Sequence, residues 1–386
     1  MEHVSSITVW LFFYFPLILA AGACLYNLAV TIACIAFRAQ RDNSASYTPR
    51  VSILKPVHGI EQNFYSCLRS HFAQDYTEFE IIFGLSGNDD SARWTISQLR
   101  KEFPHVPVKV LTLSAVHGAN PKMGKLDEMM REANYETILI NDADIRVPPD
   151  YLRKVVQPLA DKRVGLVTCL YRGIPARGLL SVLESLGMSG DFAGQVLLAR
   201  MVGEVQFGLG ATLATEKQHI SKIGGLARWA DYLADDFILG NKIAKSGLRI
   251  HISHTVVETV LPPRTIPEWF AQQLRLARTV RFSSPRGYRG LLLSYGIPLA
   301  LIALIAYPSS HLAQITLLLA ILTRWLATMT SGILVCGDPL INKYFWLYPL
   351  RDILSFGIWL ASFMGRTVTW RHVRYRLETG GRITPA

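Results

Sequence analysis

Two aspartates, Asp142 and Asp144, are separated by a single residue just after the apolar run 137–140. Side chains alternate along a strand, so both carboxylates are expected on the same side of it. Two carboxylates placed in this way can share a hard divalent cation, Mg2+ or Mn2+, which can bridge a diphosphate. The cation would neutralise the charge that develops on a departing nucleoside diphosphate. A polar loop after a strand can also carry two acids, so the motif alone does not establish this chemistry.

A second acidic pair, Asp235 and Asp236, opens the apolar run 237–240. The helix dipole favours acidic residues in a first helical turn, so the pair could serve only as a helix cap. The functional interpretation makes Asp236 a general base that takes a proton from the hydroxyl of an acceptor. Attack by that hydroxyl in a single displacement would invert the anomeric centre of a sugar.

The segment 266–282 is amphipathic, and it carries Gln272 and Arg275 in a Q-x-x-R spacing. A basic amphipathic helix lies naturally at a membrane surface, so the segment could be a plain juxtamembrane anchor. A guanidinium group also matches the geometry of a phosphate. Gln272 and Arg275 are therefore candidates for binding the donor, with the arginine on its diphosphate.

Two further groups could contact a nucleotide. Asp89 and Asp90 follow the apolar run 79–85, and they either form a solvated turn or bind the base or ribose. Lys122 and Lys125 lie in the segment Asn-Pro-Lys-Met-Gly-Lys. Lysines of this kind are usually solvated, but either one could neutralise a phosphate.

The elements that must position these residues alternate between strands and helices. Short apolar runs predict strands, and the segments between them have the periodicity of helices. The strands are expected at 51–54, 79–85, 108–113 and 137–142, and the helices at 64–72, 91–103 and 126–133. This alternation predicts an α/β fold with a mostly parallel sheet covered on both faces. Ligands bind beyond the carboxyl ends of such strands, where Asp90, Asp142 and Asp144 are expected.

Apolar segments flank this region on both sides. Residues 7–37 are long enough for a transmembrane anchor, and Arg38 and Arg41 follow at once. The positive-inside rule then places the next part of the chain in the cytoplasm. We expect a catalytic domain at 45–262, an interfacial amphipathic helix at 263–288, two transmembrane helices within 289–335, and a re-entrant or interfacial segment with a basic tail at 344–386. Arg324, inside the second of those helices, either marks a functional site or faces protein or a wet cavity.

The composition agrees with a membrane protein. Half of the residues are hydrophobic, 18% are charged, and the net charge is +11. No basic helix interleaved with aromatic residues and no zinc-ligand spacing is present, which argues against a nucleic-acid partner. The cysteines form no C-x-x-C pair, so neither a disulfide framework nor a zinc site is expected.

In chain order, Asp90, Asp142, Asp236 and Gln272-x-x-Arg275 resemble the D, D, D, (Q/R)-x-x-R-W pattern of the ceramide glucosyltransferase family. The resemblance implies a GT-A (Rossmann-like) catalytic domain and a UDP-sugar donor. It also implies that Asp90 is the nucleotide-side acid, Asp142 a metal or diphosphate acid, Asp236 the base and Arg275 the diphosphate clamp. The chain departs from the pattern at Leu276, where the family has tryptophan, and this leaves the acceptor open.

A subgroup resemblance is more specific. Several segments are similar to the hopanoid-biosynthesis-associated glycosyltransferases, namely 164–173, 207–214, 233–236, 256–259, and 274–281 with 285–288. That similarity implies transfer of N-acetylglucosamine from UDP-GlcNAc to the lipid bacteriohopanetetrol, by a multi-pass protein of the bacterial inner membrane. The alternatives are a ceramide glucosyltransferase that uses UDP-glucose, a polysaccharide synthase, and a non-catalytic membrane protein that binds a nucleotide-sugar.

Overall fold

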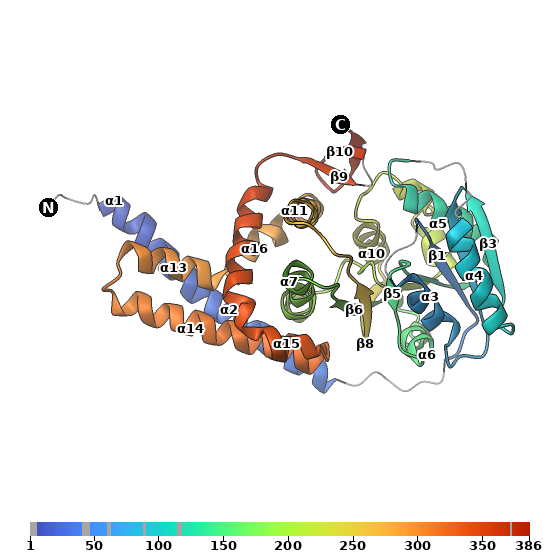
Figure 1. Cartoon of the computed structure of the whole chain (residues 1–386), viewed down its shortest axis with the longest axis horizontal. Coiled ribbons are helices and arrows are strands. Elements are labelled where there is room, and N and C mark those ends of the chain that lie inside the picture. The colour runs from blue at the N-terminus through green and yellow to red at the C-terminus, as the bar shows by residue number, and fades with distance from the viewer. Residues whose placement is uncertain (1–5, 41–46, 60–62, 88–89, 114–117, 371–372) are drawn as a thin grey trace.

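The computed structural model describes residues 6–40, 47–59, 63–87, 90–113, 118–370 and 373–386. An α/β part lies at one end and a bundle of apolar helices at the other (Figure 1). Between them lie α7 (Leu179–Gly187), α11 (Ile266–Ser283) and α16 (Tyr348–Ser362). The N-terminus is at the far end of the bundle, whereas the C-terminus lies beside the α/β part.

The α/β part is built on an eight-stranded sheet of order β3-β2-β1-β4-β7-β6-β8-β5. The strands are β1 (Val51–Pro56), β2 (Phe79–Ser86), β3 (Val108–Leu113), β4 (Thr137–Ile140), β5 (Ile145–Arg146), β6 (Val164–Ile174), β7 (Leu213–Glu216) and β8 (Arg249–Val260). Neighbours among the first four strands of that order are parallel, as are β6 and β8, whereas β7 is antiparallel to both β4 and β6. The predicted α/β fold with a mostly parallel sheet is confirmed.

Helices cover the sheet. Two of them, at 90–102 and 121–132, begin before the residue at which the hydrophobic pattern predicts their start. They include α3 (Phe64–Phe72), α4 (Asp90–Glu102), α5 (Pro121–Glu132), α6 (Tyr151–Val156) and α10 (Asp235–Lys245). Helix α5 begins at Pro121 because the Asn120 side chain caps it, accepting hydrogen bonds from the backbone N–H groups of Lys122 and Met123. Asparagine at the cap and proline at the first position are a strong helix start. Lys122 therefore lies in a first helical turn.

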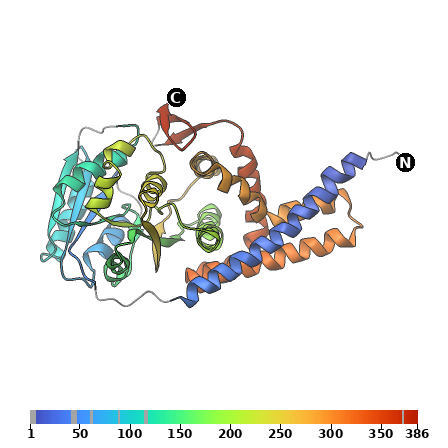
Figure 2. The same ribbon diagram turned by 180° about the vertical axis from the view of Figure 1, so that it is seen from behind.

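Two long apolar helices form the core of the bundle. One runs continuously from Trp10 to Ala39 and includes α2 (Phe15–Ala39), and the other is His311–Val335, which includes α14 (His311–Thr328). Both are long and apolar enough to cross a membrane. The first of the two transmembrane helices expected within 289–335 differs, because Pro285–Ser294 and Gly296–Ala306 meet at a 56° bend. This part is either a broken span or a re-entrant loop. Figure 2 shows α2 running from the N-terminus to the α/β part.

The last turns of α2 belong to the core of the α/β part. Val30, Ala33 and Phe37 are buried in the same apolar cluster as Leu197 and Ile250. The membrane helix is thus packed directly onto the domain rather than joined to it only by a linker.

The C-terminal basic tail forms a small antiparallel sheet, which the sequence did not predict. Its strands are β9 (Thr367–Trp370), β10 (Val373–Leu377) and β11 (Ile383–Pro385). The sheet packs on Leu233 and Phe282, and Arg382 pairs with Asp231 at 3.0 Å. The tail thereby contacts the segment that leads into α10.

Candidate active site

Asp142 stands at the carboxyl end of β4, in a turn that buried side chains hold. The neighbouring Asn141 is buried and donates through Nδ2 to the carbonyl of Ala211 at 2.6 Å. Lys55, buried at the end of β1, donates through Nζ to the carbonyl of Asp142 at 2.8 Å. The Asp142 side chain remains 40% exposed, so it is anchored by its backbone and open at its carboxylate.

Lys122 joins the two acidic segments. Its Nζ lies 2.8 Å from Asp142 Oδ1 and 2.9 Å from Asp235 Oδ2, and its side chain is only 11% exposed. Burial alone would lower the pKa of this lysine, but the two carboxylates outweigh it and raise the pKa. Lys122 is therefore a charged ammonium that bridges the end of β4 and the start of α10.

Asp236 faces the same space as Asp142. A Cβ placed on Gly210 would lie 3.1 Å from Asp236 Oδ2 and 3.8 Å from Asp142 Oδ2, so both carboxylates border the bare backbone of this glycine. Burial and the negative charge of Asp235 raise the pKa of Asp236 to about 6, although Lys122 opposes the shift. A carboxylate with such a pKa can accept a proton near neutral pH.

Asp144 completes the acidic edge of the sheet. Its Oδ2 accepts a hydrogen bond from Thr259 Oγ1 on β8 at 3.0 Å. Burial and the charge of Asp142 raise the pKa of Asp144 to about 6. The aspartates at the carboxyl ends of these strands and at the start of α10 thus outnumber the two lysines beside them, Lys55 and Lys122.

This donor set fits a hard divalent cation that is shared with a substrate. Asp142 and Asp144 offer carboxylate oxygens, and burial together with the charge of Asp142 raises the pKa of Asp144, so a bound cation would favour its ionised form. Among the described residues, no group of three or more His, Cys, Asp or Glu side chains is placed to hold a metal ion. Mg2+ is commonly bound by one or two carboxylates together with substrate phosphates, so a diphosphate would supply the remaining ligands.

A comparison with known protein families identifies the family of this chain. The model of glycosyl transferase family 21 matches residues 15–383, which is nearly the whole chain. The chain belongs to glycosyl transferase family 21. It is a glycosyltransferase, and the predicted resemblance to the ceramide glucosyltransferase family is confirmed.

Named relatives agree with this family. Ceramide glucosyltransferase 1 of Caenorhabditis elegans is 25% identical over 87% of this chain and 73% of its own length. Ceramide glucosyltransferase 3 of the same organism is 24% identical over 88% of this chain and 75% of its own. These relatives support the family and do not test the hopanoid subgroup, which stays a prediction.

A solved structure supports the fold. A mannosyltransferase from Pyrobaculum calidifontis, solved with GDP-mannose and Mn2+, superposes with a TM-score of 0.54 at 20% identity. The superposition covers 90% of this chain and 99% of that one. The family 21 glycosyltransferase therefore has the predicted GT-A-like fold.

The other predicted residues lie on neighbouring elements. Asp90 is the first residue of α4, after β2, and Asp89 lies outside the described residues. On α11, Arg275 donates through Nε and Nη2 to Gln272 Oε1 at 3.2 and 3.0 Å. The motif residues Gln272 and Arg275 therefore contact each other on α11.

Sequence reasoning missed Lys55 and Gly210, and it left open whether Lys125 is solvated or binds a phosphate. Lys125 is buried and donates to the carbonyl of Val57 at 2.8 Å, so it is not a solvated lysine. Lys55 was not predicted, although a lysine inside an apolar strand was a signal. Burial lowers the pKa of Lys55 to about 7. Gly210 carried no signal of its own, because its role depends on two side chains from other segments.

Proposed function

We propose that this family 21 glycosyltransferase transfers a sugar from a UDP-sugar to the hydroxyl of a membrane lipid, with inversion at the anomeric carbon. The observation that carries the proposal is the convergence of Asp142 and Asp236 on the space beside Gly210. One acid follows a strand at the edge where α/β sheets bind ligands, and the other has a pKa suited to a base.

In this mechanism Asp236 takes the proton from the acceptor hydroxyl, which attacks the anomeric carbon on the face opposite the nucleotide. Asp142 and Asp144 would hold Mg2+ or Mn2+, and the cation would supply charge neutralisation to the departing diphosphate. Lys122 positions Asp142 and Asp235 and is a candidate to neutralise a donor phosphate. Asp90 is assigned to the nucleotide, and Gln272 with Arg275 to the diphosphate, on the family pattern.

The arrangement along the chain supports a lipid acceptor. We assign residues 7–37 to a transmembrane anchor, 45–262 to the catalytic domain on the cytoplasmic side, and 263–288 to an interfacial helix. Residues 289–335 and 344–386 complete the membrane part. Exposed apolar residues on α11, among them Ile266 and Phe270, suit contact with a bilayer close to the domain.

The donor and acceptor follow from the resemblance rather than from the geometry. Similarity of these segments to the hopanoid-associated glycosyltransferases favours UDP-GlcNAc and bacteriohopanetetrol, in a bacterial inner membrane. The named relatives favour UDP-glucose and ceramide as the second candidate, because they are ceramide glucosyltransferases.

A lipid-product assay tests the proposal. The purified protein receives both UDP-sugars, Mg2+ or Mn2+, and both lipids, and the products are read by mass spectrometry and by NMR of the anomeric proton. We expect N-acetylhexosamine on the hopanoid with the β configuration from an α-linked donor. The variant Asp236→Asn is expected to lose transfer and keep UDP binding. Asp75→Asn, which removes an exposed surface acid, serves as the matched control.

Three results would count against parts of this proposal. A hexose on ceramide would replace both substrates and keep the reaction. Retention of configuration would exclude the single displacement. Normal transfer by Asp236→Asn would remove this residue as the base.

A further inference from the structure

The first turn of α10, which carries Asp236, is not fixed by a local cap. The residue before the helix is Ala234, and no side chain caps the turn from there. Alanine is a poor N-cap residue compared with serine, threonine, asparagine and aspartate. Segment 230–234, which leads into the helix, lies outside every helix and strand. The position of Asp236 therefore depends on what holds this segment from other parts of the chain.

The tail sheet holds segment 230–234 directly. The backbone N–H of Ile383 donates to the carbonyl of Asp231 at 2.7 Å. The N–H of Leu233 donates to the carbonyl of Gly381 at 3.3 Å, and the Leu233 side chain is buried against the apolar side chains of the sheet. The Arg382 guanidinium pairs with the Asp231 carboxylate at 3.0 Å. The tail is thus bonded to the chain only a few residues before the proposed base.

The start of α5 holds the same segment. Asn120, the cap of α5, donates through its backbone N–H to the carbonyl of Ala230 at 2.6 Å. The N–H of Ala119 donates to Oδ1 of Asp231 at 3.0 Å, while Oδ2 of the same carboxylate accepts from Arg382. One aspartate therefore bridges the tail and the start of α5.

The tail itself is anchored on α11, the helix that carries the Q-x-x-R motif. Arg278 donates through Nη1 to the carbonyl of Thr367 at 2.6 Å, at the start of β9. In the turn before β11, the N–H of Gly380 donates to the carbonyl of Phe282 at 3.0 Å. Figure 1 shows the tail strands beside α11 and close to α10. The tail therefore joins the motif helix to the segment that leads into the base.

Gly381 lies where these two contacts meet. Its φ is +87°, which favours glycine, and a Cβ there would lie 2.6 Å from Ser283 Oγ at the end of α11. Its carbonyl accepts the hydrogen bond from Leu233. A side chain at this position would push the tail away from α11 and would pull on segment 230–234.

We propose that the C-terminal tail sheet positions Asp236 for proton transfer by holding segment 230–234 in a fixed place relative to α11. Gly381 and Arg382 are positioning residues in this scheme, because they act through the backbone and side chain of that segment. The proposal rests on Asp236 as the base. A misplacement of about 1 Å can lower a rate by about a hundredfold, so a loosened tail should slow transfer.

Steady-state kinetics of the full-length protein in detergent test this role. Gly381→Ala should lower kcat by about tenfold to a hundredfold. Arg382→Gln removes one exposed ion pair and should lower kcat by about two- to fivefold. Arg382→Lys keeps the charge and should recover most of that loss. The affinity for UDP should stay at the wild-type value in all three variants, because the tail is bonded to segment 230–234.

Hydrogen–deuterium exchange separates positioning from a general loss of structure. In Gly381→Ala, the amides of 230–236 and 118–123 should exchange faster than in wild type, because their hydrogen bonds open more often. The amides of β1 and β2 should keep their wild-type rates.

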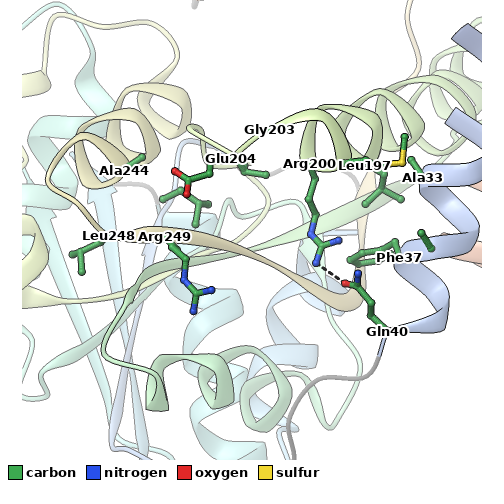
Figure 3. Close-up of a pocket in the computed structure, with 14 residues that line it drawn as sticks. Ala33, Phe37, Gln40, Leu197, Arg200, Gly203, Glu204, Ala244, Leu248 and Arg249 are labelled. Atoms are coloured by element: carbon green, nitrogen blue, oxygen red, sulfur yellow. Dashed lines mark hydrogen bonds between the residues drawn. The ribbon is translucent and has the colours of Figure 1, made fainter. Parts of the chain in front are cut away.

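Matched variants control for backbone strain and for charge. The opposite end of α10 borders a cavity of about 500 Å3, which Ala244 and Leu248 help to line (Figure 3). Gly247, between them in the sequence, has a φ of +91°, and a Cβ there would meet nothing within 4 Å. Gly247→Ala therefore adds a similar backbone strain and should keep the wild-type kcat. Arg376→Gln removes an exposed charge from β10 and should also keep it.

A wild-type kcat in Gly381→Ala, with Asp236→Asn inactive, would overturn the role of the tail alone. Faster exchange throughout β1 and β2 in Gly381→Ala would overturn it as well, because the tail would then support the whole domain. Normal transfer by Asp236→Asn would instead overturn the base assignment, and this proposal with it.

Discussion

Lys122 Nζ lies 2.8 Å from Asp142 Oδ1. Lys122 belongs to the first turn of α5, a turn that the hydrophobic pattern of the sequence does not predict. The ammonium is also 2.9 Å from Asp235 Oδ2, so one cation links the acid after β4 to the acid that precedes the proposed base. A divalent cation on Asp142 and Asp144 would have to share Asp142 with this lysine.

Removing the Lys122 charge is therefore expected to strengthen metal binding in the absence of donor. A positive charge close to a cation site opposes binding, so Lys122→Gln should raise the affinity for Mn2+ by about tenfold. Titration of free Mn2+ by electron paramagnetic resonance measures this, with Lys101→Gln as a control at an exposed lysine. Turnover should fall, because Asp142 and Asp235 lose their shared counter-ion. An Mn2+ affinity equal to or below that of wild type would contradict the competition.

Asp236 should limit stability at neutral pH. Its pKa of about 6 lies above the value of about 3.9 expected in the unfolded chain, so the folded state holds the proton more tightly. The ionised carboxylate then destabilises the fold, with no effect below about pH 4 and the full effect above about pH 6. Asp236→Asn, which can still accept from the N–H of Phe237, should stabilise the protein by roughly 3 kcal/mol at pH 8 and by less at pH 5. Melting temperatures in detergent at the two pH values measure this.

The same pKa predicts the pH dependence of transfer. A general base works only when it is deprotonated, so the wild-type kcat/KM should fall as the pH drops through about 6. A pH–rate profile at saturating Mg2+ measures the inflection. A rate that stays constant down to pH 4.5 would exclude Asp236 as the group that titrates.

A methyl group at Gly210 is expected to impair transfer, because it would crowd the carboxylate of Asp236. An added Cβ would lie 3.1 Å from Asp236 Oδ2, within the space that the proposal gives to the reacting groups. A misplacement of about 1 Å can lower a rate by about a hundredfold, so Gly210→Ala should lower kcat by about tenfold to a hundredfold. Gly357→Ala on α16, where nothing lies within 4 Å of the added atom, is the control. Unchanged kcat in Gly210→Ala would mean that the space is not used.

Local patterns in the sequence predicted much of the fold and part of the site. Apolar runs alternating with helical segments gave the order of β1 to β4, and the position of Asp142 followed from the end of β4. The partners of these residues depend on contacts between distant segments, which periodicity does not contain. Lys122 and Asp235 form an ion pair although more than a hundred residues separate them in the sequence. Gly210 borders the site only because the start of α10 and the end of β4 lie beside it.

The bend near Tyr295 and the tail sheet were missed for related reasons. Composition marks 291–307 as apolar but does not distinguish a straight helix from a bent one. The tail carries several arginines, and the sequence analysis expected only a basic tail there, with no strands. Leu377 and Ile383 are nevertheless buried against Leu233, and that contact sets the sheet in place.

Arg324 faces protein, which is one of the environments that the sequence analysis expected for it. It pairs with Asp191 in the helical turn 188–192 and with Asp352 on α16, and Arg351 pairs with Asp191 at 2.6 Å. All four side chains are almost fully buried, and the two arginines balance the two aspartates. The cluster joins the membrane helix α14 to the segment that leads out of the α/β part.

This balance predicts a compensating double variant. Arg324→Leu alone leaves two buried aspartates with one arginine, and breaking a buried pair costs about 3–5 kcal/mol. Asp352→Leu alone leaves two arginines with one aspartate and should cost a similar amount. The double variant keeps the neutral pair of Arg351 and Asp191, so it should be more stable than either single variant. Melting temperatures of the four proteins in one detergent measure the coupling. A double variant whose loss equals the sum of the two single losses would mean that the charges do not act as a unit.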